Sequence, residues 1–487
     1  MSGRLSKLMI GMLCLVMLFS LFTGCGNTQT AGNQAAETKA GAEATAAAAT
    51  PAEATAAEAT AAGAEKINMK FWMRAASKNS VTGKLVERYN KENTDNATVE
   101  FEVYGENYKN VVQMALAAGN PPDIFELNGG LTIPQLAQAN YIMPLDQYAN
   151  EEYKKNFYPE VFKQKQFYYQ GKLYAIPERA AFFRLIYNTD LFAKAGIGAP
   201  PATLEELKAD AKKITDMGKG EYYGFVAALK TASTWGRFTD NVCSISGVTG
   251  ESAFDWTTGK FDFSKQKKAL QFLIDLDKEK IMAPGALLQD IEVARAQFGQ
   301  GKYAMMIDGN WQVAQFGNNE IKCDVKWDSA PIPVFEGDKR GKSFMFFDMS
   351  KLIASGSKYK DQAWNFVKFL LDNQSEFVKN GEPLRTMIKA NDPANIPQNY
   401  LGIKNFTDIQ NSKAFPLQVQ NFLTKLEGDK VDMVYQSIFA GKTPIDKGLE
   451  DLSTRYNAAL DKALQDGEIT REDIIIPGFD YFDYYSK

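Results

Sequence analysis

Apolar and polar positions alternate regularly from residue 66 onward, and their spacing predicts five successive elements. Period-two alternation is typical of strands with one buried face, whereas apolar residues three and four positions apart are typical of amphipathic helices. The predicted elements are a strand at 66–72, a helix at 81–90, a strand at 97–104, a helix at 108–119 and a short buried strand at 124–127. This order indicates an α/β fold in which the strands pair in parallel.

Three later segments also have helical spacing. At the start of the first, Thr203 is followed three residues later by Glu206, which is the pattern of a capping box. The second and third segments cover 360–371 and 445–464. Three tryptophans that lie on an apolar helix face, in a strand or in a hairpin are expected to be structural, namely Trp256, Trp327 and Trp364.

The N-terminal pattern is different, because an apolar run from Leu8 to Phe22 follows a basic start at Arg4 and Lys7 and leads to Cys25. Fifteen residues are short for a membrane span and suit the core of a signal peptide. The arrangement resembles a bacterial lipoprotein signal, in which the cysteine becomes the lipid-modified first residue. Phe22 departs from that pattern, which usually has leucine there. A plain anchor helix, or a secretory signal cut elsewhere, is the alternative.

The segment after the apolar run is dominated by Ala, Thr, Glu and Gly up to residue 65. It contains no large apolar residue, so no core can form to offset the entropy of ordering. We expect a signal peptide at 1–24 and a disordered tether at 25–65. A coil of this length has an end-to-end distance of roughly 35 Å.

Composition narrows the classes of function. The formal net charge of −4 makes the chain a poor candidate for binding nucleic acid. The chain has no histidine, which removes His-dependent triads, common zinc sites and the usual general base. Catalysis by a pair of carboxylates remains possible, but no motif marks such a pair, and we expect no metal site, no cofactor and no catalytic residue. Cys243 and Cys323 remain after processing, and they either pair or stay as buried thiols.

Several short motifs in order resemble the extracellular solute-binding proteins of bacterial ABC importers, specifically the large family that binds carbohydrates. Each motif is weak alone, and their order over 66–465 carries the resemblance. The motifs are Phe71–Trp72, 117–123 (AAGNPPD), 171–177 (GKLYAIP), 186–192 (IYNTDLF), 298–306 (FGQGKYAMM), 308–311 (DGNW) and 363–366 (AWNF).

The resemblance implies a two-lobed periplasmic-binding-protein-like fold of type II, with ligand in the cleft and hinge strands that cross between the lobes. Crossings are placed near 177–183, 330–333 and 381–384. Lobe 1 would then be 66–178 and 333–380, and lobe 2 would be 181–330 and 383–487. The implied partners are a carbohydrate and the transmembrane permease subunits. We expect a monomer, lipid-anchored at the outer face of the cell membrane as in a Gram-positive bacterium.

Candidate ligand contacts lie first at predicted strand ends. Open α/β sheets bind ligands at the carboxyl edge of their strands. Trp72 and Arg74 end the first strand, and Glu126 and Asn128 flank the end of the third; core packing or turn formation is the alternative for each. Trp311 follows a turn after a buried run, where the family often stacks a sugar on tryptophan. Packing over that turn is its alternative.

The remaining candidates follow from the resemblance and the implied crossings. The family often has an aromatic residue in a small-residue loop like the one that contains Trp235. The sequence at 346–348, which ends in Asp348, departs from the family's usual glycines and would narrow the cleft or add stacking. The other candidates are Glu178, Arg179, Asp308 and Arg385, each of which binds ligand or pairs within the protein.

Two further readings of the same residues stay open. A surface glycosidase would need two carboxylates about 5 or 6.5–9.5 Å apart across a cleft, and no motif marks such a pair. The same fold could instead bind a peptide, a polyamine or an acidic sugar. Arg74, Arg179 and Arg385 would suit a uronic acid if they converge.

Overall fold

The structure of the protein is a computed structural model that describes residues 66–74, 79–105, 107–128, 130–407 and 412–482. The predicted signal peptide, the lipidation site Cys25 and the predicted tether lie outside these residues. None of the helices in the described part of the chain combines the length and hydrophobicity needed to cross a bilayer.

The first sheet has four strands in the order β12-β3-β1-β2. Its strands are β1 (Ile67–Arg74), β2 (Ala97–Tyr104), β3 (Ile124–Glu126) and β12 (Lys351–Ile353). β1 pairs in parallel with both β2 and β3, which confirms the predicted strands and their parallel pairing. β12 joins β3 in the antiparallel sense, with Lys351 opposite Glu126.

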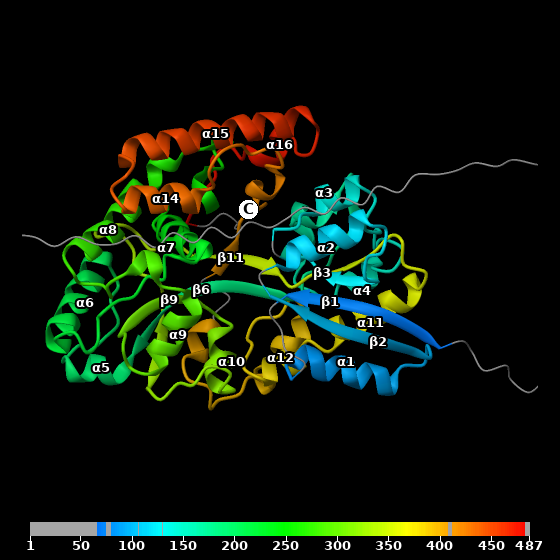
Figure 1. Ribbon diagram of the computed structural model, residues 1–487, viewed down its shortest axis with the longest axis horizontal. Helices are drawn as coiled ribbons and strands as arrows, with labels where there is room; N and C mark the ends of the chain where they lie inside the picture. Colours follow the sequence, from blue (N-terminus) through cyan, green and yellow to red (C-terminus); the bar gives the residue numbers. More distant parts are fainter. Residues whose placement is uncertain (1–65, 75–78, 106, 129, 408–411, 483–487) are drawn as a thin grey trace, which may run out of the picture. The chain divides into compact units, whose positions relative to one another are not determined.

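Helices cover both faces of the first sheet because its two successive crossover connections run in opposite directions. α1 (Val81–Glu92) leads to β2 on one side of β1, and α2 (Tyr108–Ala117) leads back to β3 on the other. Right-handed crossovers in opposite directions place the two helices on opposite faces, as Figure 1 shows. α11 (Lys360–Asp372) packs beside α1, and the ring of its Phe366 meets Phe71 of β1 at 5.4 Å.

The second sheet is built around the long strand β6 (Arg179–Asn188). Its other strands are β9 (Met305–Gly309), β10 (Trp327–Ala330), β11 (Ser343–Asp348) and β13 (Ser412–Ala414). β9, β10 and β11 all pair with β6 in the antiparallel sense, and β13 pairs with β11 in parallel.

This pairing corrects one predicted boundary. The crossing placed at 330–333 is wrong, because β11 bonds to β6 and residues 333–348 therefore lie with the second sheet. The chain passes to the first sheet between Asp348 and Lys351, directly from β11 into β12. The predicted start of the last segment at 383 is also too early, since Met387 forms an antiparallel bridge with Phe157, which belongs to the predicted first lobe.

Two local predictions from the sequence are confirmed. The predicted capping box is present, with the Glu206 amide donating to the Thr203 hydroxyl at 3.1 Å. Trp256, Trp327 and Trp364 are all buried, as predicted. The helices and strands that surround the second sheet or extend the first are α3 (Ile133–Gln138), α4 (Glu151–Lys154), β4 (Tyr168–Tyr169), β5 (Lys172–Leu173), α5 (Thr189–Lys194), α6 (Leu204–Gly218), α7 (Ala232–Ile245), β7 (Phe254–Asp255), β8 (Lys260–Phe261), α8 (Lys267–Lys278), α9 (Ile291–Gly299), α10 (Gln312–Gly317), α12 (Ser375–Lys379), α13 (Ile403–Phe406), α14 (Val431–Phe439), α15 (Ile445–Gln465) and α16 (Arg471–Ile474).

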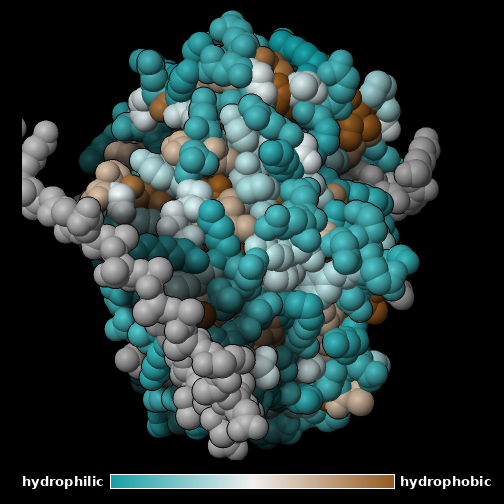
Figure 2. All heavy atoms as spheres, turned by 90° about the vertical axis from the view of Figure 1, so that its right-hand side faces the viewer, coloured by the Kyte–Doolittle hydropathy of each residue, from teal (hydrophilic) through white to brown (hydrophobic). Residues whose placement is uncertain are grey.

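Two hydrophobic cores stabilise the described part of the chain. The first surrounds β1, β3 and α11 and continues to one face of the second sheet, where it includes Phe316 and Trp327. The second fills the space between the second sheet and helices α7, α8, α14 and α15. Figure 2 shows that the face at the right of Figure 1 is mostly hydrophilic, with hydrophobic residues in small separate groups. Cys243 and Cys323 are both free thiols, so the alternative of a disulfide is not realised.

Candidate functional site

The carboxyl ends of β1 and β3 bring four predicted residues together, and we call Trp72, Arg74, Glu126 and Asn128 the first-sheet edge. The backbone amide of Arg74 donates to Oε2 of Glu126 at 3.0 Å. The Arg74 guanidinium donates from Nη1 to Oδ1 of Asn128 at 3.4 Å. Neighbouring parallel strands end at the same edge, so the predicted grouping of these side chains is what the structure has.

Glu126 is a buried carboxyl in an unusual environment. It is only 1% exposed, and it lies opposite Lys351 in the β3–β12 register. Burial raises the pKa of Glu126 to about 7, and the positive Lys351 and the Arg74 amide offset part of that rise. Near neutral pH this group is therefore a mixture of acid and carboxylate, able to donate as well as accept a hydrogen bond.

Trp72 is partly buried at the same edge. Its ring lies 5.0 Å from the ring of Tyr104, and it packs against the core around β1. Its indole Nε1 is buried and has no hydrogen-bond partner among the described residues. Indole N–H groups usually find a partner when buried, so this donor is one that a ligand can satisfy after a small rearrangement.

The second sheet presents an aromatic surface made of Phe183, Trp311 and Phe346, which we call the aromatic platform. Phe183 meets Trp311 edge to face at 5.6 Å and lies 5.8 Å from Phe346. Trp311 and Phe346 are only partly buried. The Trp311 ring lies directly against Gly309, where an added Cβ would be 2.3 Å from Cη2 of the indole. Glycine at 309 therefore lets the ring lie flat against the backbone.

Three arginines surround the Trp311 ring. The guanidinium carbons of Arg179, Arg237 and Arg295 lie 5.1, 5.4 and 5.9 Å from its centroid, within the range of cation–π attraction. The indole is therefore surrounded by guanidinium groups, each of which is also ion-paired with a carboxylate.

Asp308 accepts hydrogen bonds from two of these arginines. Arg295 donates to both of its oxygens, at 2.7 and 2.9 Å, and Arg237 donates to Oδ1 at 2.9 Å. Burial alone would raise the pKa of Asp308, but Arg295 and Arg237 hold it below its usual value. Asp308 is 0% exposed, so it positions the arginines and has no surface of its own to offer a ligand.

The first-sheet edge and the aromatic platform meet where three chain segments cross. Figure 1 shows β6 and β11 at the point where β1 ends. In this crossing, Arg179 donates from Nε and Nη2 to Asp348 at 2.9 and 2.6 Å. Glu126 contributes to the field that raises the pKa of Arg179, so the two regions are electrostatically connected.

Two other predicted contacts are buried within the crossing. Glu178 forms an ion pair with Lys351 at 2.9 Å, and both side chains are almost fully buried. Arg385 is 0% exposed, bonds to Glu382 and stacks on the Phe377 ring at 3.9 Å. For both residues the structure favours the alternative of pairing within the protein.

Backbone strain marks the same crossing. Met349, between β11 and β12, has φ of +60°, and Leu384, beside β6, has φ of +62°. Positive φ costs a non-glycine residue of order 1 kcal/mol or more, and such strain concentrates at sites that move. These two residues lie on the segments that connect the two sheets.

The prediction that Trp235 lies in a ligand-facing loop is wrong. The residue lies on α7, is 1% exposed, and donates from Nε1 to the Leu229 carbonyl at 3.1 Å. Its ring packs against Tyr435 and Phe439 of α14. Small and polar residues before it suggested a loop, but its packing with α14 makes this segment the first turn of a buried helix.

Sequence reasoning missed Phe183, Arg237 and Arg295 as parts of the site. Arg237 follows Trp235 by two residues on α7, and it is Arg237, not Trp235, that reaches the platform. Arg295 lies on α9 and reaches the platform only because β9 brings Asp308 alongside it. No signal in the sequence pairs the two arginines with Asp308, which lies 71 positions from Arg237 and 13 from Arg295.

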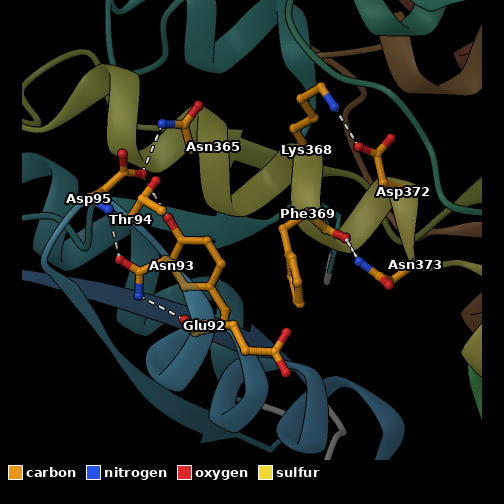
Figure 3. A pocket seen from close by; sticks show the side chains of 10 residues that line it. Glu92, Asn93, Thr94, Asp95, Asn365, Lys368, Phe369, Asp372 and Asn373 are labelled. Atoms are coloured by element: carbon orange, nitrogen blue, oxygen red, sulfur yellow. Dashed lines mark hydrogen bonds and ion pairs between the residues drawn. The ribbon is translucent and has the colours of Figure 1, made fainter.

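Two hollows elsewhere on the surface contain none of the predicted contacts. One, of about 460 Å³, lies between α1 and α11 (Figure 3). Its side chains satisfy one another, as when Asn365 donates to Asp95 at 2.8 Å and Asn373 to the Phe369 carbonyl at 2.8 Å. The other, of about 720 Å³, lies between the β4–β5 hairpin and the α15–α16 segment, with Tyr168 among its lining residues.

Comparisons with known proteins agree with this geometry. The family model for bacterial extracellular solute-binding proteins matches residues 75–376. A Brucella abortus (strain 2308) protein, named only as a binding protein, is 31% identical over 360 residues, which cover 71% of this chain and 82% of the relative. The maltotriose-binding protein of Pyrococcus abyssi (strain GE5 / Orsay) is 27% identical over 268 residues, or 54% of each chain.

A solved structure supports the fold. The maltose/maltodextrin-binding domain from Bdellovibrio bacteriovorus, bound to maltotriose, matches with a TM-score of 0.65 and 21% identity, covering 82% of this chain and 100% of that one. The predicted α/β periplasmic-binding-protein fold is therefore confirmed. Proteins of this kind bind solutes and do not catalyse a reaction, which overturns the glycosidase alternative. The chain belongs to the bacterial extracellular solute-binding proteins.

Proposed function

We propose that this protein is the sugar-binding subunit of an ABC importer and that the sugar binds between the first-sheet edge and the aromatic platform. The observation that carries the proposal is the partly buried Trp311 ring, which lies against Gly309 and 5.1 Å from the guanidinium of Arg179, at the start of β6 where the two sheets meet. A pyranose has flat C–H faces that suit such a ring and hydroxyls that suit the polar groups of the first-sheet edge. Relatives named for maltotriose support a sugar as ligand.

The energetics are sufficient for a micromolar site. Each hydrogen bond to a sugar hydroxyl contributes roughly 0.5–1.5 kcal/mol net, and more if the partner is charged. Burying one or two aromatic side chains contributes roughly 1.5–3 kcal/mol each. A few such contacts reach about −8 kcal/mol, which corresponds to micromolar affinity.

Two lobes that close on the ligand explain how capture is signalled. We place the first lobe at 66–178 and 350–395 and the second at 179–349 and 396–487, which revises the predicted boundaries according to the strand pairing. A ligand that touches both lobes favours the closed state, and the crossing segments absorb the rotation. The strained residues Met349 and Leu384 are the expected pivots. The permease then distinguishes loaded from empty protein by shape.

The location follows from the N-terminal segment. We propose that Cys25 carries a diacylglyceryl group and that 25–65 tethers a monomeric binding protein to the outer face of the cell membrane. Two acyl chains are roughly what stable anchoring requires. The tether lets the binding protein sample the space near its permease.

Thermal unfolding with a panel of mono- and oligosaccharides tests the ligand class. A ligand at 100 times its dissociation constant stabilises the folded protein by about 2.7 kcal/mol, which is easily measured. We expect at least one carbohydrate to raise the melting temperature. If none does while a peptide or polyamine does, the fold is the same but the ligand class is wrong.

Replacement of Cys25 by alanine tests the anchor. We expect the variant to leave the membrane fraction and appear in the medium or in a soluble fraction. Retention of the Cys25→Ala protein in the membrane would show that the apolar run itself is the anchor.

A further inference from the structure

Three cations where the two sheets cross each have one ion-pair partner. Arg179 pairs with Asp348, Lys351 with Glu178 and Arg385 with Glu382. The cluster around Asp308 is different, because its one buried carboxylate serves two buried arginines and its second carboxylate, Glu292, is 63% exposed.

Arg295 is the better satisfied of those two arginines. It donates from Nε and Nη2 to the two oxygens of Asp308, and its Nη1 donates to Glu292 at 2.7 Å. Both oxygens of Asp308 are therefore engaged before Arg237 is considered. The carboxylate charge is largely matched by Arg295 alone, because a bidentate pair is the stronger arrangement.

Arg237 is left with incomplete partners. Its Nη1 shares Oδ1 of Asp308 at 2.9 Å, and its Nη2 donates to the Ser233 hydroxyl at 3.3 Å. Its Nε is buried and has no hydrogen-bond partner among the described residues. The side chain is only 10% exposed, so water does not compensate for the missing partner. Among the described residues, the buried part of this cluster therefore holds two guanidiniums and one carboxylate, since Glu292 lies at the surface.

The incompletely paired guanidinium of Arg237 lies on the aromatic platform itself. Its carbon is 5.4 Å from the Trp311 ring centroid and 5.5 Å from that of Phe183. Through Ser233 it also lies beside the first turn of α7, where the helix dipole is positive. Aromatic surface for a sugar ring and a site for an anion therefore coincide.

We propose that the ligand is an acidic sugar, a uronic acid or an oligosaccharide that contains one, with its ring on Trp311 and its carboxylate against Arg237. The proposal rests on the proposed function and specifies the substrate class of the same site. A ligand carboxylate supplies a second negative charge beside the two buried guanidiniums, whereas a phosphate carries more charge than the buried groups can match. A modest shift of the Arg237 side chain on closure breaks the long bond from Nη2 to Ser233 and presents Nε and Nη2 to the two carboxylate oxygens.

This assignment differs from the uronic-acid reading based on Arg74, Arg179 and Arg385. Arg179 and Arg385 each have a carboxylate of their own, in Asp348 and Glu382. Those two charges are already matched, so they do not select an anionic ligand.

A matched pair of ligands tests the proposal in the wild-type protein. Isothermal titration compares oligouronides with their methyl esters, which keep the size and ring but lose the charge. We expect the acids to bind ~10- to 100-fold more tightly, since a hydrogen bond to a charged group is stronger than a neutral one. Acids that bind no better than esters would overturn the acidic-sugar proposal. In that case binding of esters or of neutral sugars would leave the proposed function standing, whereas no binding of any carbohydrate would overturn both.

Variants of Arg237 locate the selectivity. In Arg237→Gln we expect the acid affinity to fall to that of the ester while ester binding persists, which also reports an intact fold. Arg237→Lys should keep part of the preference, because it keeps the charge but not the planar fork. Arg455→Gln, on the outer helix α15, is the matched control and should leave the ratio unchanged. An equal loss for acid and ester in Arg237→Gln, or an unchanged ratio, would contradict the proposal; if that variant does not fold, the wild-type ratio decides.

Discussion

Each of the two regions of the site contains a fully buried carboxyl at the carboxyl end of a strand, and the two are opposite in charge state. Glu126 ends β3, and burial raises its pKa to about 7. Asp308 lies near the end of β9, and two arginines hold its pKa below the usual value. Because both carboxyls lie at the end of a strand, the difference between their pKa values comes from the partners that the tertiary structure places around each one.

That difference separates two tasks. The Asp308 carboxylate is committed to Arg237 and Arg295 and organises the charged surface beneath Trp311. The neighbours of Glu126 are a backbone amide and the charge of Lys351. Near neutral pH its carboxyl can therefore gain or lose a proton and can either donate or accept a hydrogen bond. The aromatic platform is thus rigid and cationic, whereas the first-sheet edge is adaptable.

The largest expected effect on stability comes from removing the negative charge of Asp308 beside the platform. Asp308→Asn should lower the free energy of unfolding at pH 7 by about 3–5 kcal/mol, because two buried guanidiniums lose their counter-ion. Glu126→Gln should lower it by less than about 1 kcal/mol, because the amide resembles the protonated acid already present in the folded state. Urea unfolding of both variants measures this. Equal losses would show that the two carboxyls do not differ as described.

The pH dependence of stability sharpens the same contrast. Glu126 titrates near 4.5 when unfolded and about 7 when folded, so between these values the folded state holds a proton that the unfolded state has lost. Stability should therefore fall as pH rises from about 4.5 to 7, by up to about 3 kcal/mol from this group. Asp308, with its lowered pKa, contributes stability that is lost only when the pH falls below the usual aspartate range.

Glu126→Gln isolates the contribution of one group. Burial also raises the pKa of Asp240 to about 6 and of Glu251 to about 8, and both give a slope of the same sign. The difference between the unfolding curves of wild type and variant removes these shared contributions. A difference that does not change between pH 4.5 and 7 would show that Glu126 is ionised throughout.

Smaller effects are expected from the aromatic part of the platform. Trp311→Ala should weaken binding of the ligand found in the panel by roughly 1.5–3 kcal/mol, the contribution of a buried aromatic surface. Gly309→Ala should weaken binding by less, because its methyl group displaces the ring without removing it. Titration calorimetry measures both. Undiminished affinity in Trp311→Ala would remove the platform from the site.

Much of the first sheet could be predicted because its elements are local and regular. The strands at β1, β2 and β3 have clean alternation, and parallel neighbours must end at one edge, which placed Trp72, Arg74, Glu126 and Asn128 together. The capping box at Thr203 was predictable for the same reason, since both partners lie within one helical turn.

The second sheet could not be predicted to the same degree. β11 was assigned to the wrong lobe because its run of aromatic residues shows no alternation that distinguishes one sheet from the other. Trp235 was assigned to a loop because the helix packing that buries it involves Tyr435 and Phe439, two hundred positions further along. Hydrogen-bond partners across such separations leave no local pattern.

The sequence by itself determined the α/β class, the edge of the first sheet and the absence of histidine chemistry, because periodicity and composition are properties of short segments. Tertiary structure alone decided which charges are matched. Asp308 could have been a ligand contact or a turn residue until β9 brought it between Arg237 and Arg295. Whether a buried charge is fully paired depends on distances between segments far apart in the chain, and that is why the incompletely paired Arg237 beside Trp311 is identified only in the tertiary structure.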